Sequence, residues 1–269
     1  MVLRKILEFN ADTPTSLLEA SVIQWQWKED VFPECDQFNG IHEGLVQSWK
    51  DIFPKKGEIY FAGALENNED TGTLQYLAST AMEAGFSTRV LDMQALDLQN
   101  GRFFDPAGEL VNRCFKLYPW EWMVDESPDG CLAEMEWLEP IWKLVMSNKA
   151  ILATLYELFP DSPYVLPCYL SRPRSGLFCK KPVFSREGHN VSVVDIRNWE
   201  EHVRIAETEG DYNTGAYVYQ EYVEPTVYSG RYPVIGSWII GGEAVGIGIR
   251  ENRMEVTDNL SEFVPHIIG

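Results

Sequence analysis

Basic residues are scarce in this sequence, which has 22 lysines and arginines against 41 aspartates and glutamates and a formal net charge of -19. Nucleic acids and anionic membrane surfaces bind proteins through basic patches, so neither is expected as the main partner. The acidic excess has two interpretations. It favours solubility, and it also suits a cationic substrate such as a polyamine.

Long hydrophobic runs are missing as well. No segment approaches the roughly 20 consecutive apolar residues of a membrane span, and the N-terminus lacks the apolar core of a signal peptide. The cysteines are few, odd in number and scattered without metal-ligand spacing: Cys35, Cys114, Cys131, Cys168 and Cys179. These absences predict a cytoplasmic protein with reduced thiols. The histidines show no metal spacing either and are interpreted as structural: His42, His189, His202 and His266.

A chain of 269 residues with 45% hydrophobic content can bury a sizeable core, in one large domain or two closely packed ones. Residues 58–92 have a strand, helix, strand pattern, with the helix over 73–84 and Gly85 as its stop, which predicts a parallel sheet. A hairpin is predicted over 102–111, turning at 105–108. A helix is predicted over 140–159, broken near 147–148. From residue 177 onward the pattern predicts antiparallel strands, with one helix over 197–207. Four tryptophans of the middle region are expected to serve mainly core and interface packing: Trp120, Trp122, Trp137 and Trp142.

Residues 3–10 alternate as a strand does, which would place Glu8 and Asn10 on one face. A carboxylate and an amide oxygen make a partial Mg²⁺ site, because this ion uses few protein ligands and keeps waters or phosphates. Glu8 can instead belong to a structural ion pair. Thr13 and Pro14 then predict a helix start leading into residues 16–27.

The last third of the chain has a lysine-bearing strand, a polar glycine loop and a further strand with an amide. Lys181 precedes a proline that keeps the backbone extended, and its neighbour Lys180 should point to the opposite face. In the loop 185–190, Ser185 and Gly188 can offer backbone N–H groups to a polyanion, although a plain hairpin turn would need no ligand. In the next strand Gln220 and Glu221 take opposite faces, as they also would in a simple edge strand. This order of parts predicts a nucleotide site.

The order of these parts resembles the ATP-grasp enzymes, and the residues of the motifs resemble those of the glutathionylspermidine synthase-like family. The matching stretches are spread over nearly the whole chain: residues 7–13, 147–149, 181–191, 219–220, 248–251 and 261–266. The resemblance implies an α/β protein of ATP-grasp fold, with a parallel-sheet substrate and metal-binding region over 1–148 and a largely antiparallel nucleotide-binding region over 149–269.

The resemblance also implies an activity and a set of site residues. Members join a carboxylate to an amine through an acyl phosphate, using ATP and Mg²⁺, with a glutathione-like peptide and a polyamine-like amine as substrates. The roles carried over are Lys149, Lys181, Ser185, Gly188, Gln220 and Glu221 for ATP, Glu8 and Asn10 for the metal, Thr13, Thr15 and Ser16 for the peptide, and Arg250 for the transferring phosphoryl group. Arginine suits that task because its planar fork is always charged.

Two departures from the family pattern leave alternatives open. Relatives have an additional strand with an Arg-x-Asp motif upstream of Glu8, so this sequence is expected to be an N-terminally incomplete member, and Glu262 replaces a common arginine. The alternatives are an ATP-binding but inactive module and a purely structural interaction domain. Glu69 and Asp70 could meet an amine or simply begin the following helix.

Overall fold

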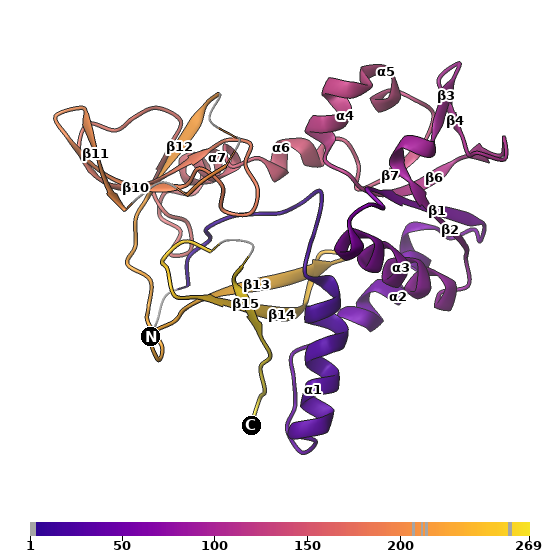
Figure 1. Cartoon of the computed structure of the whole chain (residues 1–269), viewed down its shortest axis with the longest axis horizontal. Coiled ribbons are helices and arrows are strands. Elements are labelled where there is room, and N and C mark those ends of the chain that lie inside the picture. The colour runs from indigo at the N-terminus through magenta and orange to yellow at the C-terminus, as the bar shows by residue number, and fades with distance from the viewer. Residues whose placement is uncertain (1–3, 206–207, 211, 213–214, 258–259) are drawn as a thin grey trace. The chain divides into compact units, whose positions relative to one another are not determined.

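The computed structural model describes residues 4–205, 208–210, 212, 215–257 and 260–269. It divides into two compact units, between which the chain passes several times (Figure 1). The first unit comprises Met1–Asn10, Val145–Val234 and Glu251–Glu262, and the second comprises Ala11–Leu144, Ile235–Arg250 and Phe263–Gly269. One of these passages lies close to the predicted boundary at residue 148, and the functional division at that residue stays a prediction.

The second unit is built on a four-stranded parallel sheet in the order β2-β1-β6-β7. Its strands are β1 (Glu58–Gly63), β2 (Ser87–Asp92), β6 (Arg113–Leu117) and β7 (Glu136–Leu138). Strand β1 is almost entirely buried, as expected for a central strand that is covered on both faces. The predicted parallel sheet is therefore confirmed.

Helices cover both faces of this sheet in Figure 1. They are α2 (Ile41–Ile52) and α3 (Asn68–Glu83) on one side, and α4 (Trp120–Glu126) and α5 (Pro128–Cys131) on the other. The alternation of β1 explains this arrangement, because Ile59 and Phe61 join one hydrophobic cluster while Tyr60 and Ala62 join the other. Trp120 and Trp137 are buried in the second cluster, whereas Trp122 and Trp142 are exposed, so the packing expected of the four tryptophans holds for two.

Smaller elements complete the second unit. A π-helix η1 (Glu19–Ile23) continues directly into α1 (Gln24–Val31), and the 3₁₀ turn η2 (Met93–Ala95) precedes a three-stranded antiparallel sheet of β3 (Asp97–Gln99), β4 (Arg102–Phe104) and β5 (Leu110–Val111). The predicted hairpin is present in β4 and β5, where the Gly108 N–H donates to Asp105 O at 2.9 Å. Most residues of a further sheet also belong to this unit; its order is β13-β14-β15, from β13 (Tyr232–Ile240), β14 (Glu243–Asn252) and β15 (Glu262–Val264).

The first unit holds a five-stranded antiparallel sheet in the order β11-β10-β9-β12-β8. Its strands are β8 (Cys168–Tyr169), β9 (Gly176–Pro182), β10 (Ser192–Arg197), β11 (Glu200–Ile205) and β12 (Tyr217–Glu221). Helix α7 (Ile151–Leu158) packs Leu152 and Ala153 against Val218 of this sheet. Helix α6 (Lys143–Ser147) precedes α7, so the break predicted near 147–148 is confirmed. The α/β class with a parallel and an antiparallel sheet is also confirmed.

Four local predictions are wrong. Residues 4–10 form no strand; the Ile6 N–H donates to Tyr164 O at 2.9 Å, and no ladder develops. Residues 200–205 form strand β11 instead of a helix, because Asn198 and Trp199 both adopt positive φ (51° and 71°) and join β10 to β11 as a two-residue hairpin turn. Helical turns begin at Leu17 rather than at Pro14, and α3 begins five residues before Thr73.

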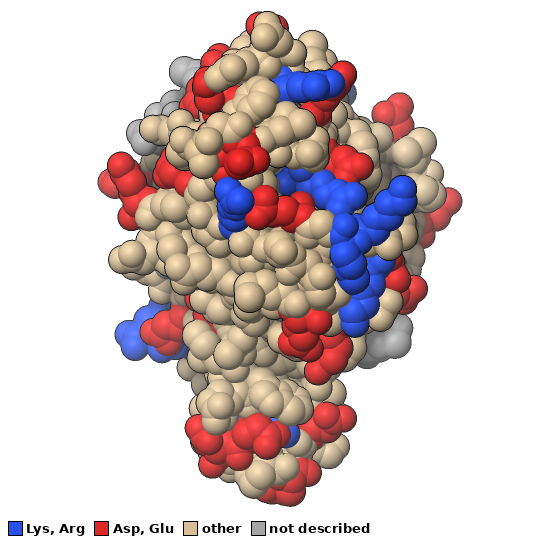
Figure 2. Space-filling view, turned by 90° about the vertical axis from the view of Figure 1, so that its right-hand side faces the viewer, with Lys and Arg blue, Asp and Glu red and all other residues tan. Residues whose placement is uncertain are grey.

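The acidic excess does not form one continuous surface on the face in Figure 2, where basic and acidic side chains lie beside each other around a broad uncharged area. Strand arginines of the second unit are paired accordingly, with Arg89 to Glu58, Arg102 to Glu134 and Arg113 to Glu136, each at 2.8 Å.

None of the helices in the described part of the chain has the length and apolar composition needed to cross a membrane.

Candidate functional site

Strand β9 of the first unit separates the two neighbouring lysines as predicted. Lys180 forms an ion pair with Glu201 at 2.7 Å and lies over the ring of Tyr217. Lys181 is only 7% exposed, and its ammonium group donates to Gln220 Oε1 at 2.8 Å and to Leu7 O at 2.9 Å. Successive strand residues point to opposite faces, so only Lys181 reaches the group of polar residues described next.

Gln220 of the neighbouring strand β12 lies on the same face as Lys181 and is 2% exposed. Both polar atoms of its amide have a partner, because Oε1 accepts from Lys181 and Nε2 donates to Ile6 O at 2.9 Å. The alternation of the strand turns the Glu221 side chain to the other face, where it is exposed. The Glu221 backbone N–H donates to Pro167 O. A nucleotide that bound to Lys181 and Gln220 would have to replace the carbonyl groups of Ile6 and Leu7 as their partners.

Lys149 supplies a second buried ammonium group to the first unit. It lies at the start of the turn that leads into α7, where its N–H donates to Val183 O. Its Nζ donates to Ser185 O at 2.6 Å and to Glu8 Oε1 at 3.2 Å. Burial lowers the pKa of Lys149, and Coulombic attraction from Glu8 opposes this shift while Lys181 adds to it. Glu8 is thus an ion-pair member here, which was the structural alternative to a metal ligand.

The loop 185–190 has an unusual backbone. Glu187, Gly188 and Asn190 have φ values of 56°, 72° and 55°. A Cβ atom at Gly188 would lie 2.1 Å from Thr257 O, so glycine is required there by both conformation and space. Loops with residues at positive φ can gather backbone N–H groups into a concave anion-binding site, which is the predicted role of this loop. The N–H groups of His189 and Asn190, however, already donate to Arg186 O and Thr208 O, at 2.9 and 3.1 Å.

The residues gathered in the first unit fit the chemistry of a magnesium nucleotide. Lys149 and Lys181 are cations in a strongly acidic chain, and Gln220 is an amide able to read a base edge. In the part of the chain that the structure describes, no three His, Cys, Asp or Glu side chains gather into a metal-binding group. Glu8 and Asn10 offer one carboxylate and one amide, which is the sparse protein contribution that Mg²⁺ accepts when phosphates and waters complete its shell.

The second unit fixes the segment before its first helix by a buried ion pair. Asp12 Oδ1 accepts from Lys116 Nζ at 2.5 Å, and Asp12 Oδ2 accepts from the Trp120 N–H at 2.8 Å. The side chains of Lys116 and Asp12 are 0% and 1% exposed. Lys116 also donates to Tyr118 O and lies over the Trp120 ring. Burial lowers the pKa of Lys116, and the charge of Asp12 opposes this shift.

This ion pair places the predicted peptide-binding residues at the carboxyl edge of the parallel sheet. Thr13, Thr15 and Ser16 follow Asp12 directly, and Ser16 has a φ of 61°, which is strained for a residue other than glycine. The strand order reverses between β1 and β6, and open parallel sheets bind ligands beyond the carboxyl ends of their strands at such a point. The position of the segment therefore suits a substrate site.

Two further predicted groups lie in the second unit. Glu69 and Asp70 occupy the first turn of α3, where Asn67 caps the helix by accepting from the Glu69 N–H at 2.9 Å. This is the helix-entry role that the sequence left open. Arg250 lies near the end of β14, whose glycines serve internal packing: a Cβ at Gly246 would lie 2.7 Å from Ile41, and one at Gly248 would lie 2.9 Å from Phe263.

Comparison with known proteins decides the family. The family model described as glutathionylspermidine synthase preATP-grasp matches residues 3–269. The chain belongs to this family. The predicted family is therefore confirmed, while the individual site roles stay predictions.

Relatives agree with this family, and a solved structure shares the fold. A protein of Haemophilus influenzae assigned as an acid–amine ligase is 38% identical over 97% of this chain and 70% of its own length. Trypanothione synthetase of Crithidia fasciculata is 28% identical, and the bifunctional glutathionylspermidine synthetase/amidase of Escherichia coli is 26% identical; this chain spans 44% and 47% of them. A glutathione synthetase-like effector of Globodera pallida, at 10% identity, shares the fold with a TM-score of 0.58 over 98% of this chain and 72% of its own.

Sequence reasoning about this family member missed Asp12 and Lys116 as a pair. One signal was available, since a lysine inside the otherwise apolar stretch Cys114–Leu117 needs a buried partner. The hydrogen bonds from Lys181 to Leu7 O and from Gln220 to Ile6 O could not be predicted from the sequence, because every residue has the same main-chain acceptor. Glu262, which replaces a family arginine, pairs with Arg231 at 3.1 Å.

Proposed function

We propose that this chain is an ATP-dependent carboxylate–amine ligase. A ligase of this kind transfers the γ-phosphoryl group of ATP to a carboxylate, releasing ADP, and lets an amine attack the resulting acyl phosphate, releasing phosphate and forming an amide. The observation that carries the proposal is the convergence of Lys149, Lys181 and Gln220, all buried, in the first unit at the positions of the family motifs. Burying two ammonium groups is costly, so their retention in one place favours a ligand with several negative charges.

The residues of the chain would divide the work between binding and charge neutralisation. Lys149 and Lys181 would hold phosphate oxygens, and Gln220 with the backbone of Glu221 would read the adenine edge. Glu8 and Asn10 would hold Mg²⁺, and the N–H groups of loop 185–190 would cover the phosphates. Phosphoryl transfer needs little covalent chemistry from the protein, so alignment and fixed positive charge are the expected contributions.

The substrates proposed are a glutathione-like peptide and a polyamine-like amine. Support comes from the names of the relatives, which are synthetases of trypanothione and of glutathionylspermidine. Thr13, Thr15 and Ser16 would hold the peptide, and Arg250 would contact the transferring phosphoryl group. The net charge of -19 favours the approach of a cationic amine by long-range attraction.

Calorimetric titration of magnesium-ATP tests the nucleotide site. In Lys181→Met we expect the Kd to rise by about 10- to 100-fold, since a hydrogen bond to a charged group contributes about 1.5–3 kcal/mol. Lys180→Met is the matched control, because it removes the adjacent lysine of the same strand and also breaks an ion pair, yet on the opposite face.

Two outcomes would contradict the proposal. Equal loss of binding in both variants would mean that strand β9, rather than Lys181, is damaged. Tight binding without magnesium-dependent phosphate release in the presence of glutathione and spermidine would favour an inactive ATP-binding module. Thermal unfolding of both variants shows whether they are folded.

A further inference from the structure

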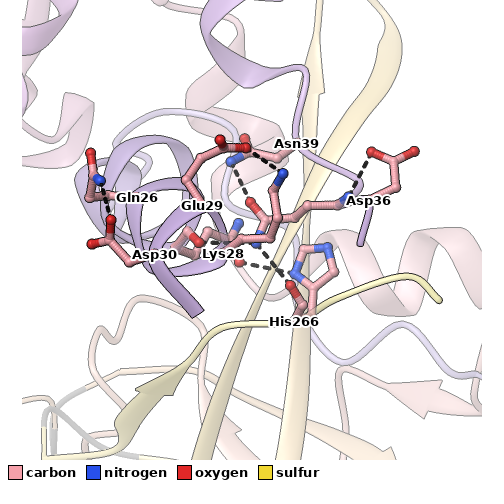
Figure 3. Close-up of polar contacts among 9 residues, drawn as sticks. Gln26, Lys28, Glu29, Asp30, Asp36, Asn39 and His266 are labelled. Carbon is pink, nitrogen blue, oxygen red and sulfur yellow. Dashed lines mark hydrogen bonds and ion pairs between the residues drawn. The ribbon is translucent and has the colours of Figure 1, made fainter. Parts of the chain in front are cut away.

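The closing segment of the chain, residues 263–269, is held in the second unit by a network of buried amides and one histidine. Figure 3 shows His266 pointing toward α1 and toward the connection that carries Asp36 and Asn39. Two backbone hydrogen bonds join Asp36 and Ile268, at 2.9 and 2.7 Å. The Gln37 side chain donates to His266 O at 2.8 Å and to Gln24 O at 3.2 Å. This contact accounts for a family motif, residues 261–266, that the proposed function leaves without a role.

Gln24 has only one orientation available in this network. It is 0% exposed, and its Nε2 donates to two carbonyl groups, Ala20 O at 2.5 Å and Ile247 O at 2.9 Å. A flipped amide would place its oxygen against both carbonyls, which cannot donate. Gln24 Oε1 must therefore face His266 Nδ1, which lies 2.9 Å away.

The tautomer of His266 follows from its two neighbours. Because Gln24 Oε1 can only accept, Nδ1 must carry the proton. On the other side of the ring, the Phe38 N–H donates to His266 Nε2 at 3.2 Å, so Nε2 must be unprotonated. A neutral imidazole with its proton on Nδ1 satisfies both partners, whereas an imidazolium would set two donors, Nε2–H and the Phe38 N–H, against each other.

The network also forms hydrogen bonds with the strand that carries Arg250. Gln24 Nε2 donates to Ile247 O, the Gly40 N–H donates to Val245 O at 2.7 Å, and the Ile247 N–H donates to Phe38 O at 3.2 Å. The Phe38 peptide thus contacts His266 through its N–H and β14 through its carbonyl. Arg250 lies three residues beyond Ile247 in the same strand.

The charged groups on the surrounding elements form other contacts, lie outside the network or, like Glu34 on the connection, are exposed. On α1, Lys28 pairs with Glu29 at 2.5 Å and lies over the Trp25 ring, and Asp30 accepts from Gln26 (Figure 3). On the connection, Asp36 accepts from the Gln37 N–H. On β14 the charged residues of this unit are Glu243 and Arg250, which lie outside the stretch 245–247 that forms these hydrogen bonds. Residues 263–269 contain no ionisable side chain other than His266.

We infer that His266, held as the neutral Nδ1–H tautomer, is a positioning residue that fixes β14 and thereby the guanidinium of Arg250. The inference rests on the proposed function for the role of Arg250, but the state of the histidine can be measured without it. Burial lowers the pKa of His266 below its ordinary value of 6.5. The unfolded chain therefore takes up the proton first as pH falls. The hydrogen bonds of His266 to Gln24 and Phe38 are intact above pH 6.5 and are lost as pH falls through the lowered pKa.

The first test is nitrogen NMR of the histidine-labelled protein from about pH 8 to pH 5, with amide exchange of Phe38 followed in parallel. We expect the Nδ1–H tautomer for His266, and faster exchange at Phe38 once His266 is protonated. His202, which is exposed on β11, is the internal reference for the assignment of the nitrogen signals. An Nε2–H tautomer, or protonation of His266 at or above its ordinary pKa of 6.5, would overturn the inference, whether or not the chain proves to be a ligase.

The second test is turnover of magnesium-ATP with glutathione and spermidine by His266→Asn. Asparagine can still donate to Gln24, but it has no atom at the position of Nε2 to accept from the Phe38 N–H. We therefore expect kcat to fall by about five- to tenfold with an unchanged KM for ATP. The acid limb that His266 adds to the kcat–pH profile should also vanish. His202→Asn should keep both. An unchanged kcat–pH profile in His266→Asn would reject the positioning role, while absence of turnover in the parent chain would reject the proposed function and leave the NMR result to decide the state of His266.

Discussion

Replacement of Lys116 by methionine should lower the free energy of unfolding by about 3–5 kcal/mol, which is the usual cost of removing one partner from a buried ion pair. Asp12 would keep its hydrogen bond from the Trp120 N–H but would lose the ammonium group 2.5 Å from its other oxygen. A carboxylate that is 1% exposed has no access to water, so nothing replaces the lost partner. Equilibrium unfolding in urea measures the effect.

Two further variants decide whether the charge or the packing is responsible. The double variant Asp12→Asn with Lys116→Met removes both charges and should recover most of the lost stability, because paired removal of buried charges is often close to neutral. Arg102→Met breaks an exposed pair of the same unit, 54% and 74% exposed, and should change stability by less than about 0.5 kcal/mol. Equal stability of Lys116→Met and the parent chain would mean that Asp12 is not a buried charge.

The sequence could predict those parts of the fold that local burial controls. The apolar run of β1, the alternation of β9 and the stop of α3 at Gly85, with a φ of 95°, are each visible within a few residues. The hairpin between β10 and β11 was missed because its turn uses Asn198 and Trp199, and a tryptophan at positive φ gives no turn signal of the usual Asn-Gly kind. The predicted start of α3 was too late. Asn67 caps the helix, but the residues directly after it are polar, and a prediction based on apolar spacing does not recognise them as helical.

The candidate site was predictable in its residue types and faces but not in its pairings. The opposite orientation of Lys180 and Lys181 follows from strand geometry alone. The partners of the buried lysines do not, because Lys149 and Glu8 are 141 positions apart and Lys116 and Asp12 are 104 apart. Only the fold brings such residues together, and a carboxylate predicted as a metal ligand, Glu8, is found as the partner of a lysine. A bound magnesium nucleotide would compete for that same carboxylate.

Replacement of Arg250 by alanine should lower kcat for magnesium-dependent ADP release by about 10³-fold or more, the scale found for arginines that stabilise a transferring phosphoryl group. The guanidinium is always charged and offers a planar fork, so a lysine in its place would restore only part of the rate. Its backbone belongs to β14, a strand whose register is fixed by the Gly40 and Ile247 hydrogen bonds, so its side chain starts from a defined position. The assay uses glutathione and spermidine as the acid and the amine.

Arg253→Ala is the matched control for this prediction, because Arg253 is an exposed arginine only three residues further along the chain. It carries the same charge and should leave kcat within about twofold of the parent, since exposed substitutions away from a site have small effects. A role confined to the transition state requires that Arg250→Ala lower kcat while the calorimetric Kd for magnesium-ATP stays nearly unchanged. A rise in Kd with normal kcat would instead make Arg250 a ground-state phosphate ligand, and retention of kcat within about tenfold would remove it from the phosphoryl-transfer step altogether.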